Sequence, residues 1–265
     1  MDGIENRDGG ENHLRWDTRY EWKVVLLLAL AFGLVGMDRF VINTLWNTIS
    51  VDLGLEPRAI GNLAGLTAVA WGVFAIIFGR LADRWGHRKI IIWAVVLFSL
   101  MGGLSGMAST LIFFIGVRTL LGMMEGAYTP TSFTAVAVAS KPNRRGLNQG
   151  LQQCGVSLLG LALAPLVATQ LLAAGISWRW IFVLIAAPGL ILAALLWKVL
   201  KEPKDTQGAA ALGVVQDTSP LSFGALLVSY LGPLKSYNIV VCTIALLGAM
   251  CGLFTLAAMV PIYLE

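Results

Sequence analysis

Charged residues are scarce in this chain. Only 13% of its 265 residues are Asp, Glu, Lys or Arg, and 57% are hydrophobic, whereas soluble domains carry about 25% charged residues. A chain this apolar has too little polar surface to cover itself in water, so a water-soluble enzyme is nearly excluded. The mean hydropathy of +0.76 favours a membrane protein instead.

Cysteine, targeting and cofactor signals are also lacking. The three cysteines, Cys154, Cys242 and Cys251, lie in apolar runs. An odd number there argues against a disulfide framework or a metal site, and we interpret them as small core residues. The first twenty residues contain no apolar segment of a cleavable signal peptide. No phosphate loop, metal-ligand spacing or nucleophile triad is found, so we expect no cofactor, no metal and no enzymatic activity.

Seven stretches are apolar enough to form membrane helices, which need about 20 residues each. They cover residues 22–45, 60–81, 90–107, 111–139, 151–174, 180–200 and 239–263. We therefore predict an all-α membrane protein. Its expected parts are a cytoplasmic tail (1–21), a six-helix half (22–200), a cytoplasmic connector (201–237) and a seventh helix (238–265). Within the connector, residues 221–231 are apolar but too short to span, which is typical of an interfacial segment.

Basic residues alternate between the loops. The tail and the loops after the second, fourth and sixth stretches are rich in Lys and Arg, whereas the loop after the third has none. Cytoplasmic loops carry this excess, so we expect a multi-pass protein of the cell membrane with its N-terminus in the cytoplasm. The net charge of +4 has the same origin and does not indicate nucleic-acid binding.

Four ionisable residues lie inside the predicted spans: Asp38 and Arg39 in the first, and Arg118 and Glu125 in the fourth. Each costs about 2.5 to 3.5 kcal/mol at the centre of a membrane helix, so such residues usually face a functional cavity. From the span ends, Asp38, Arg39 and Arg118 lie at a similar depth, roughly 10 Å below the outer surface. We expect Asp38 to pair with Arg118, and Glu125 to be a lone carboxylate two turns deeper.

This set of charges suits the movement of an anion together with protons. The planar fork of arginine matches a carboxylate, and a carboxylate shielded from water readily takes up a proton. Arg39 and Arg118 would thus bind the substrate, while Asp38 and Glu125 would carry H⁺ as the coupling ion. The alternative is a purely structural ion pair between Asp38 and Arg118, which leaves the other two charges unexplained.

The spacing of the charges also indicates an internal repeat. The first and fourth spans are the first helices of two three-helix sets, as in the inverted 3+3 repeats of transporters. The longest connector follows the sixth span, where one six-helix half would end. We therefore expect a fragment, about 60% of a protein with roughly twelve spans, that holds the N-terminal half and the seventh helix and does not transport alone.

The turn between the second and third spans carries a recognisable motif. Residues 79–89 read GRLADRWGHRK, and this closely resembles the signature loop of the major facilitator superfamily. Gly79 and Gly86 permit a tight turn, and Asp83 is suited to cap a helix start. The resemblance implies that this loop, with Arg84 and Arg88, gates the cytoplasmic side of an alternating-access transporter.

The charged spans resemble one branch of that superfamily, the anion:cation symporters, which carry sugar acids and other organic anions. The resemblance implies proton coupling at Asp38 and Glu125 and substrate binding at Arg39 and Arg118. It covers residues 22–200 and, more weakly, the seventh span. This chain has Gly36 and Trp71 where the branch commonly has tyrosines. We therefore expect Trp71 to contact the substrate and to favour a less hydroxylated, even aromatic, carboxylate.

Three further features have two interpretations each. Tyr128 lies one turn beyond Glu125 and contacts either substrate or the core. Gln152 reaches either the cavity or the cytoplasmic interface. Small-residue pairs at four-residue spacing, such as Gly122 with Gly126, are expected to permit close helix crossings.

We therefore predict a secondary transporter that imports an organic carboxylate with protons by alternating access. Its expected partners are a small anionic substrate and the lipid bilayer, and the full-length protein is expected to be a monomer. The first alternative is an exporter of the same superfamily that exchanges drugs or metabolites for protons. The second is a seven-span receptor or sensor, which would be complete at this length.

Overall fold

The computed structural model describes residues 17–56, 59–202, 232 and 235–264, and in these residues every regular element is a helix. The predicted all-α class is thus confirmed. Six helical spans are long and apolar enough to cross a membrane. The chain divides into two units, Met1–Gln216 and Asp217–Glu265, and the first contains all six spans.

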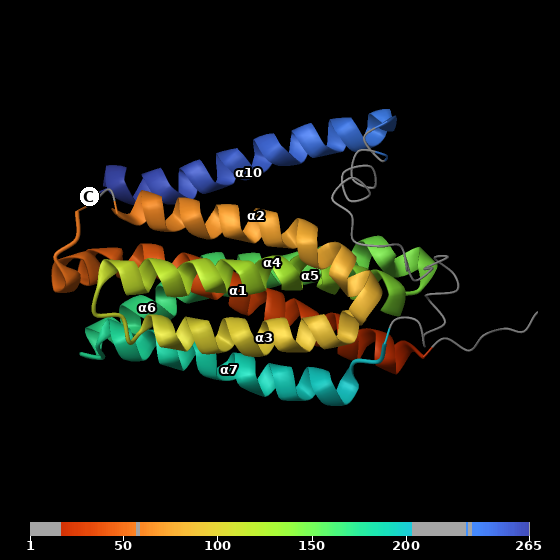
Figure 1. The fold of residues 1–265 in the computed structure, drawn as a ribbon, viewed down its shortest axis with the longest axis horizontal. Coiled ribbons are helices and arrows are strands. Elements are labelled where there is room, and N and C mark those ends of the chain that lie inside the picture. The colour runs from red at the N-terminus through yellow and green to blue at the C-terminus, as the bar shows by residue number, and fades with distance from the viewer. Residues whose placement is uncertain (1–16, 57–58, 203–231, 233–234, 265) are drawn as a thin grey trace, which may run out of the picture. The chain divides into compact units, whose positions relative to one another are not determined.

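The first unit is a bundle of helices that run along a common direction (Figure 1). Its helices are α1 (Thr18–Leu53), α2 (Ala59–Trp85), α3 (His87–Ser105), α4 (Leu111–Ala139) and α7 (Trp178–Val199). The fifth span has three parts: α5 (Arg145–Gly155), the π-helical segment η2 (Val156–Leu163) and α6 (Ala164–Ala173), and a short 3-10 turn, η1 (Pro142–Arg144), precedes them. In the second unit, α10 (Tyr237–Leu264) covers the predicted seventh helix.

Most helices extend beyond the predicted apolar stretches. α4 has the predicted bounds, whereas α1 begins four residues earlier than its stretch and ends eight later. The Asp17 side chain caps α1 by accepting hydrogen bonds from the backbone N–H groups of Arg19 and Tyr20. At the other end Gly54 adopts a φ of +61°, which favours glycine. Hydropathy locates the part of a helix in hydrocarbon, while capping residues set its ends.

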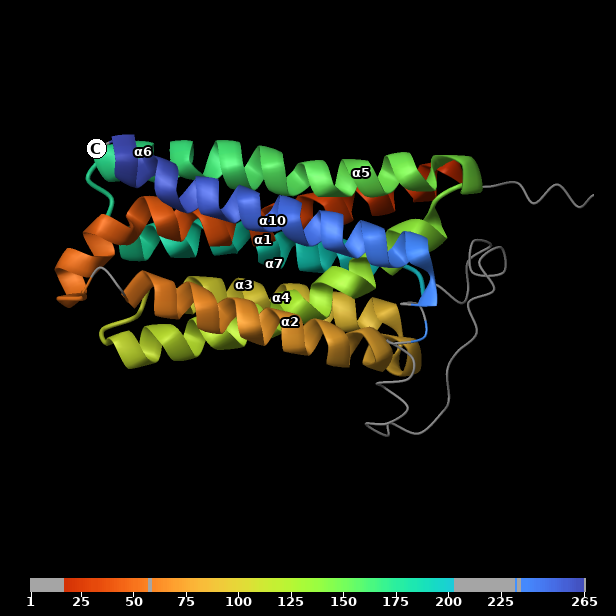
Figure 2. The same cartoon turned by 90° about the horizontal axis from the view of Figure 1, so that it is seen from above.

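Helix α1 occupies the middle of the bundle. It packs against α4 and α7 and along the whole fifth span, and α4 also packs against α2 and α3. Figure 2 shows the fifth span running beside α1. Contacts between α1 and α4 join Asp38 to Arg118 and Leu28 to Tyr128, so the two helices are antiparallel.

Glycines allow the closest helix crossings. A Cβ on Gly160 would stand 2.8 Å from the carbonyl carbon of Gly36, so η2 and α1 approach backbone to backbone. Gly122 and Gly126 of α4 lie against the backbones of Thr67 and Trp71 on α2. The close crossing predicted for this pair is therefore present, and it brings α2 next to the charged part of α4.

Several predictions fall on residues outside those described. They concern most of the tail and of the connector, including the interfacial segment at residues 221–231. The interpretation of the cysteines as core residues is wrong: Cys154, Cys242 and Cys251 are exposed. In a membrane protein the side chains that face lipid are as apolar as those of the core, so an apolar run alone does not place a cysteine inside.

Candidate functional site

The four intramembrane charges meet where the middle of α1 faces α4. Asp38, Arg118 and Glu125 are 6%, 3% and 0% exposed, respectively. The Arg39 side chain, at 28%, is the most accessible of the four. We call these residues the charge site. Because these side chains are shielded from water, pairing between opposite charges is their dominant interaction.

Arg118 forms the first ion pair. Its Nη1 atom donates a hydrogen bond to Asp38 Oδ2, and the predicted pair of Asp38 with Arg118 is thus present. The guanidinium also lies 4.8 Å from the Phe182 ring centroid and 5.5 Å from that of Phe114. Two aromatic rings therefore hold the arginine by cation–π contacts in addition to the carboxylate.

Arg39 forms the second pair, with Glu125. Its Nε and Nη2 atoms lie 2.8 and 2.7 Å from Glu125 Oε2, so the expectation of a lone carboxylate is wrong. Because α1 and α4 are antiparallel, Glu125 lies nearer to the N-terminal end of α1 than Arg118 does. Helix side chains lean toward the N-terminus of their own helix, so the long Arg39 side chain reaches along α1 to Glu125. A comparison of Cα depths alone overlooks this reach. The other carboxylate oxygen, Oε1, is buried without a hydrogen-bond partner in the described part of the chain.

Trp71 of α2 borders the second pair. The Arg39 guanidinium carbon lies 5.1 Å from its ring centroid. The indole Nε1 donates to Thr129 Oγ1 at 3.3 Å, and that hydroxyl donates to the Glu125 carbonyl oxygen at 2.8 Å. This tryptophan, predicted to contact substrate, therefore lies next to the most accessible arginine of the charge site.

Tyr128 is part of the core between α1 and α4. It is fully buried, and its hydroxyl donates to the Leu28 carbonyl oxygen at 2.7 Å. Its ring contacts those of Phe32 and Phe98, with centroids 6.2 and 6.0 Å away. This position agrees with the core-packing alternative, and we leave Tyr128 out of the proposed substrate site.

Gln152 is also enclosed, in the contact between α5 and α4. It is fully buried, and its Nε2 donates to Ser132 Oγ at 2.9 Å. Its Oε1 is a buried acceptor that no described donor reaches. The structure thus places Gln152 in a helix contact, and we leave it, too, out of the proposed substrate site.

The signature loop is a single-residue turn. α2 ends at Trp85 and α3 begins at His87, and Gly86 between them has a φ of +98°, which requires glycine. Gly79, Asp83 and Arg84 lie in the last turns of α2. The N-cap residue of α3 is Gly86, which makes no side-chain cap, so Asp83 does not occupy the capping position. Asp83 Oδ1 lies 3.4 Å from Nε2 of His87, the first residue of α3.

The loop also contacts the end of the sixth span. Arg88 Nη2 donates to the Trp197 carbonyl oxygen on α7 at 2.6 Å. The Glu202 carboxylate lies against Gly86, where a Cβ would stand 2.6 Å from Oε1. A gating role of Gly79, Asp83, Arg84, Gly86 and Arg88 stays a prediction, but the turn is anchored to the segment that leaves the bundle.

Sequence reasoning missed a buried polar cluster near the start of α1. Glu21, assigned to the tail, is fully buried. Its Oε1 accepts hydrogen bonds from Asn148 Nδ2 at 2.8 Å and from the Lys141 backbone N–H at 3.2 Å. Asn148 also donates to Ser140 Oγ at 2.7 Å. We call Glu21, Ser140, Lys141 and Asn148 the end cluster. Asn148 and Gln152 are polar residues four positions apart, and this spacing was the feature of the sequence that could have indicated a buried polar contact here.

A second missed contact joins the opposite end of the bundle. Asp52, near the end of α1, lies 2.5 Å from Arg179 Nη1 and accepts a hydrogen bond from Trp178 Nε1 at 3.1 Å. Arg179 also donates to the Ala108 carbonyl oxygen in the connection between α3 and α4. Both charged side chains are about two-fifths exposed, so this contact aligns helix ends and contributes little to stability.

Comparisons with known proteins identify the family. The family model described as Major Facilitator Superfamily matches residues 28–265. The hexuronate transporter of Bacillus subtilis (strain 168) is 29% identical over 74% of this chain and 46% of its own length. Efflux pump FUS6 of Gibberella moniliformis is 29% identical over 70% of this chain and 33% of its own length. The chain thus spans less than half the length of these relatives.

The comparison with solved structures indicates the same family. A bacterial homologue of the human lysosomal transporter Spinster, solved in an inward-facing, unoccupied conformation, superposes with a TM-score of 0.63 and 25% identity. The match covers 69% of this chain and 44% of that one. With six helices that are long and apolar enough to cross a membrane, the chain is a multi-pass membrane protein. It belongs to the Major Facilitator Superfamily.

Proposed function

We propose that the protein imports an organic carboxylate together with protons by alternating access, as a member of the anion:cation symporter branch. The observation that carries the proposal is the pairing of two buried carboxylates with two arginines between α1 and α4. This part of the bundle is predicted to be the N-terminal half, residues 22–200, of a longer transporter that completes the substrate cavity.

The paired geometry supplies a coupling mechanism. While Glu125 is ionised, it neutralises Arg39, and the arginine has little affinity left for a second carboxylate. Protonation of Glu125 removes this competitor, so Arg39 becomes free to bind the carboxylate of a substrate. The same exchange applies to Asp38 and Arg118, which is less accessible. Substrate and proton then bind together, as symport requires.

Trp71 supports a substrate with an apolar or aromatic face. Its ring lies against Arg39, so an anion held by that arginine would also contact the indole. The similarity to a hexuronate transporter, named for a sugar acid, supports the carboxylate class. Hexuronates and aromatic carboxylates are therefore the first substrates to test.

Orientation follows from the loop charges. The Lys and Arg alternation supports a cytoplasmic N-terminus in the cell membrane, which places the signature loop between α2 and α3 on the cytoplasmic side. There its contacts with α7 and Glu202 would break as the protein opens inward. Export is the second candidate, because an efflux pump is among the relatives.

Uptake into proteoliposomes tests the direction and the coupling. The intact protein is reconstituted, and labelled carboxylates are offered with an inward proton gradient, with no gradient, or with an outward gradient. Symport requires accumulation that depends on the inward gradient and is abolished by a protonophore. Proton-driven export would instead show accumulation only with the outward gradient. Uptake indifferent to the gradient would contradict proton coupling.

A further inference from the structure

An aromatic cluster lies against Arg118. It consists of Phe114 on α4 and of Trp178 and Phe182 on α7, and all three side chains are buried. The three ring centroids lie 6.0 to 6.4 Å from one another, and each pair packs edge to face. The Arg118 guanidinium carbon stands 4.8 Å from the Phe182 centroid and 5.5 Å from that of Phe114. Two rings of the cluster therefore contact the cation, and the third packs against both.

The cluster keeps its geometry through contacts outside the charge site. Trp178 Nε1 donates a hydrogen bond to Asp52 Oδ2 at 3.1 Å, and the Arg179 guanidinium carbon lies 4.4 Å from the centroid of the same indole. Edge-to-face packing then fixes Phe114 and Phe182 against this tryptophan. The two rings are thus oriented independently of the ion pairs in the charge site.

Arg118 has unused hydrogen-bond donors. Its Nη1 atom contacts Asp38, through Oδ2 and, at 3.5 Å, through the carbonyl oxygen. Its Nε and Nη2 atoms are buried and have no hydrogen-bond partner among the described residues. An aromatic face attracts a cation through its quadrupole, without a lone pair that would take up an N–H donor. The aromatic cluster therefore holds the arginine while these donors stay available for a carboxylate.

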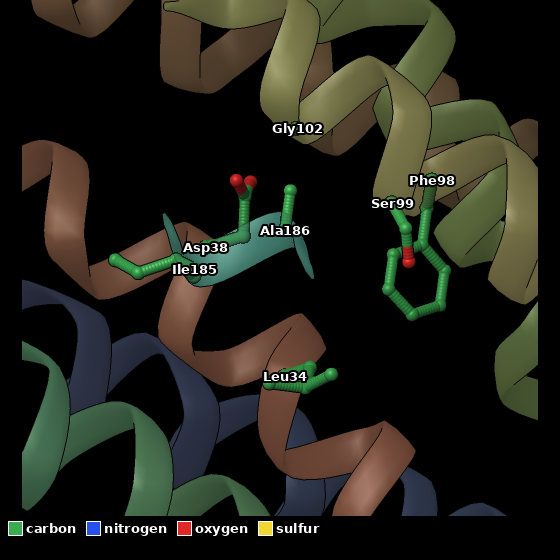
Figure 3. Close-up of a pocket in the computed structure, with 7 residues that line it drawn as sticks. All are labelled: Leu34, Asp38, Phe98, Ser99, Gly102, Ile185 and Ala186. Atoms are coloured by element: carbon green, nitrogen blue, oxygen red, sulfur yellow. The ribbon is translucent and has the colours of Figure 1, made fainter. Parts of the chain in front are cut away.

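Helix α7 approaches both members of this ion pair with apolar side chains. Phe182 contacts Arg118, and one turn later Ala186 lines a small cavity together with Asp38 (Figure 3). The described residues that line this cavity from α3 and α7 are uncharged. The other acid of the charge site already has an arginine partner. When Asp38 loses its charge, the aromatic rings are therefore the partners that Arg118 retains among the described residues.

We propose that Phe114 and Phe182 are positioning residues: they keep Arg118 in place once its acid partner is neutralised, so that its fork binds the carboxylate of the substrate. The proposal rests on the proposed function, in which Asp38 takes up a proton and releases Arg118 for a substrate anion. While Asp38 is ionised, the carboxylate and the rings both hold the guanidinium, and afterwards the rings hold it alone. An arginine kept in its binding orientation does not have to be ordered again when substrate arrives, which preserves affinity.

A change to the ring face tests this role with little change of shape. A trifluorinated phenylalanine in place of Phe182 keeps the ring but withdraws negative charge from its face, so it weakens the cation–π contact. Phe182→Leu, which removes the ring, is the larger version of this change. The matched control is the same fluorination of Phe32, a buried ring of α1 that packs against Phe133 and Tyr128. Each replacement is made in the unmodified protein and in Asp38→Asn, whose uncharged side chain imitates the protonated acid.

The measurement is the Kd of glucuronate, a hexuronate, and of benzoate, an aromatic carboxylate, for the intact protein in detergent, by titration calorimetry. In Asp38→Asn, fluorination of position 182 should raise Kd about 3- to 30-fold, the range that a cation–π contact is worth. With Asp38 present the rise should be smaller, because the carboxylate also holds the arginine. Fluorination of position 32 should leave Kd within about twofold in both backgrounds. If the two positions affect Kd equally, the positioning role is wrong, even where the melting temperature falls.

This binding experiment needs no proton gradient, so its outcome is separable from that of the uptake experiment. A Kd that depends on the ring at position 182, combined with uptake indifferent to the gradient, would support the positioning role and contradict proton-coupled import. Gradient-dependent uptake combined with a Kd that does not depend on this ring would overturn the positioning role and leave the proposed function standing.

Discussion

The charge site lies between α1 and α4, and the end cluster joins α1 to α5 and to the connection before it. Both bury acidic side chains, but they satisfy them differently. Asp38 and Glu125 each contact an arginine. Among the described residues, Glu21 accepts hydrogen bonds from two neutral donors, the Lys141 backbone N–H and the Asn148 side-chain amide. In both places a glutamate oxygen is buried without a hydrogen-bond partner among the described residues, Oε1 of Glu125 and Oε2 of Glu21.

This difference implies two roles: the charge site can exchange its binding partners, whereas the end cluster holds the chain in place. An ion pair can be exchanged, because a proton on the acid frees the arginine for another anion. Neutral donors have no such alternative charge to release, so a carboxylate that they hold serves to fix the chain. The end cluster thus ties the start of α1 to the connection between α4 and α5, whereas the charge site can change partners during a transport cycle.

The largest effect is expected from Glu125→Gln. The amide cannot release a proton and cannot neutralise Arg39, so proton-driven accumulation should fall to the level of protein-free liposomes. Substrate binding, and exchange of labelled for unlabelled substrate, should persist, because Arg39 stays free to bind the carboxylate. Accumulation and exchange measured on the same vesicles check both expectations.

The matched control makes the same substitution in the other region. Glu21→Gln also neutralises a fully buried glutamate, and the amide oxygen still accepts the hydrogen bonds to Oε1. Accumulation should keep its gradient dependence in this variant. If Glu21→Gln abolished it and Glu125→Gln did not, the functional contrast between the two regions would be reversed.

A smaller effect is expected from Arg39→Ala. Loss of charge-assisted hydrogen bonds to the substrate is worth about 1.5 to 3 kcal/mol, and KM for the carboxylate should rise about 10- to 100-fold. Arg39→Lys should lie in between, because lysine keeps the charge without the planar fork. An unchanged KM in both variants, measured by uptake under a fixed gradient, would remove Arg39 from the substrate site.

The end cluster should affect stability instead of transport. Glu21→Ala removes the acceptor that the Asn148 amide and the Lys141 N–H share, at a cost of about 1 to 3 kcal/mol. Reversible unfolding in mixed micelles would measure this loss. Glu21→Gln should lose less, because it keeps an acceptor in place. A stable Glu21→Ala protein with altered coupling would contradict the assignment of this cluster to chain attachment.

The sequence was sufficient for the helices because hydropathy reports directly on the bilayer. It predicted seven spans, of which the first six correspond to the six spans of the first unit, and it predicted the bounds of α4, since apolar length is a local property. It also indicated the pair of Asp38 with Arg118, because both lie at one depth. The pair of Arg39 with Glu125 was missed because it depends on how far a long side chain reaches along a neighbouring helix.

Burial at the edges of spans was the harder problem. Glu21 was assigned to the tail because a charged residue next to an apolar run normally faces water. Its burial depends on α5 and the preceding turn folding over it, and no local pattern encodes that. Tyr128 illustrates the same limit: its position next to Glu125 along α4 suggested a substrate contact, but the hydroxyl points to the Leu28 carbonyl oxygen.

The smallest effect is expected from Tyr128→Phe, which tests whether this residue belongs with the charge site or with the core. Removal of the hydroxyl leaves the Leu28 carbonyl without this donor, so the protein should lose about 0.5 to 1.5 kcal/mol of stability. KM for the carboxylate should stay within about twofold, because a fully buried ring does not meet substrate. A KM raised tenfold at unchanged stability would instead mean that α1 and α4 separate enough during transport to expose the hydroxyl, and Tyr128 would then join Arg39 and Trp71 in the substrate site.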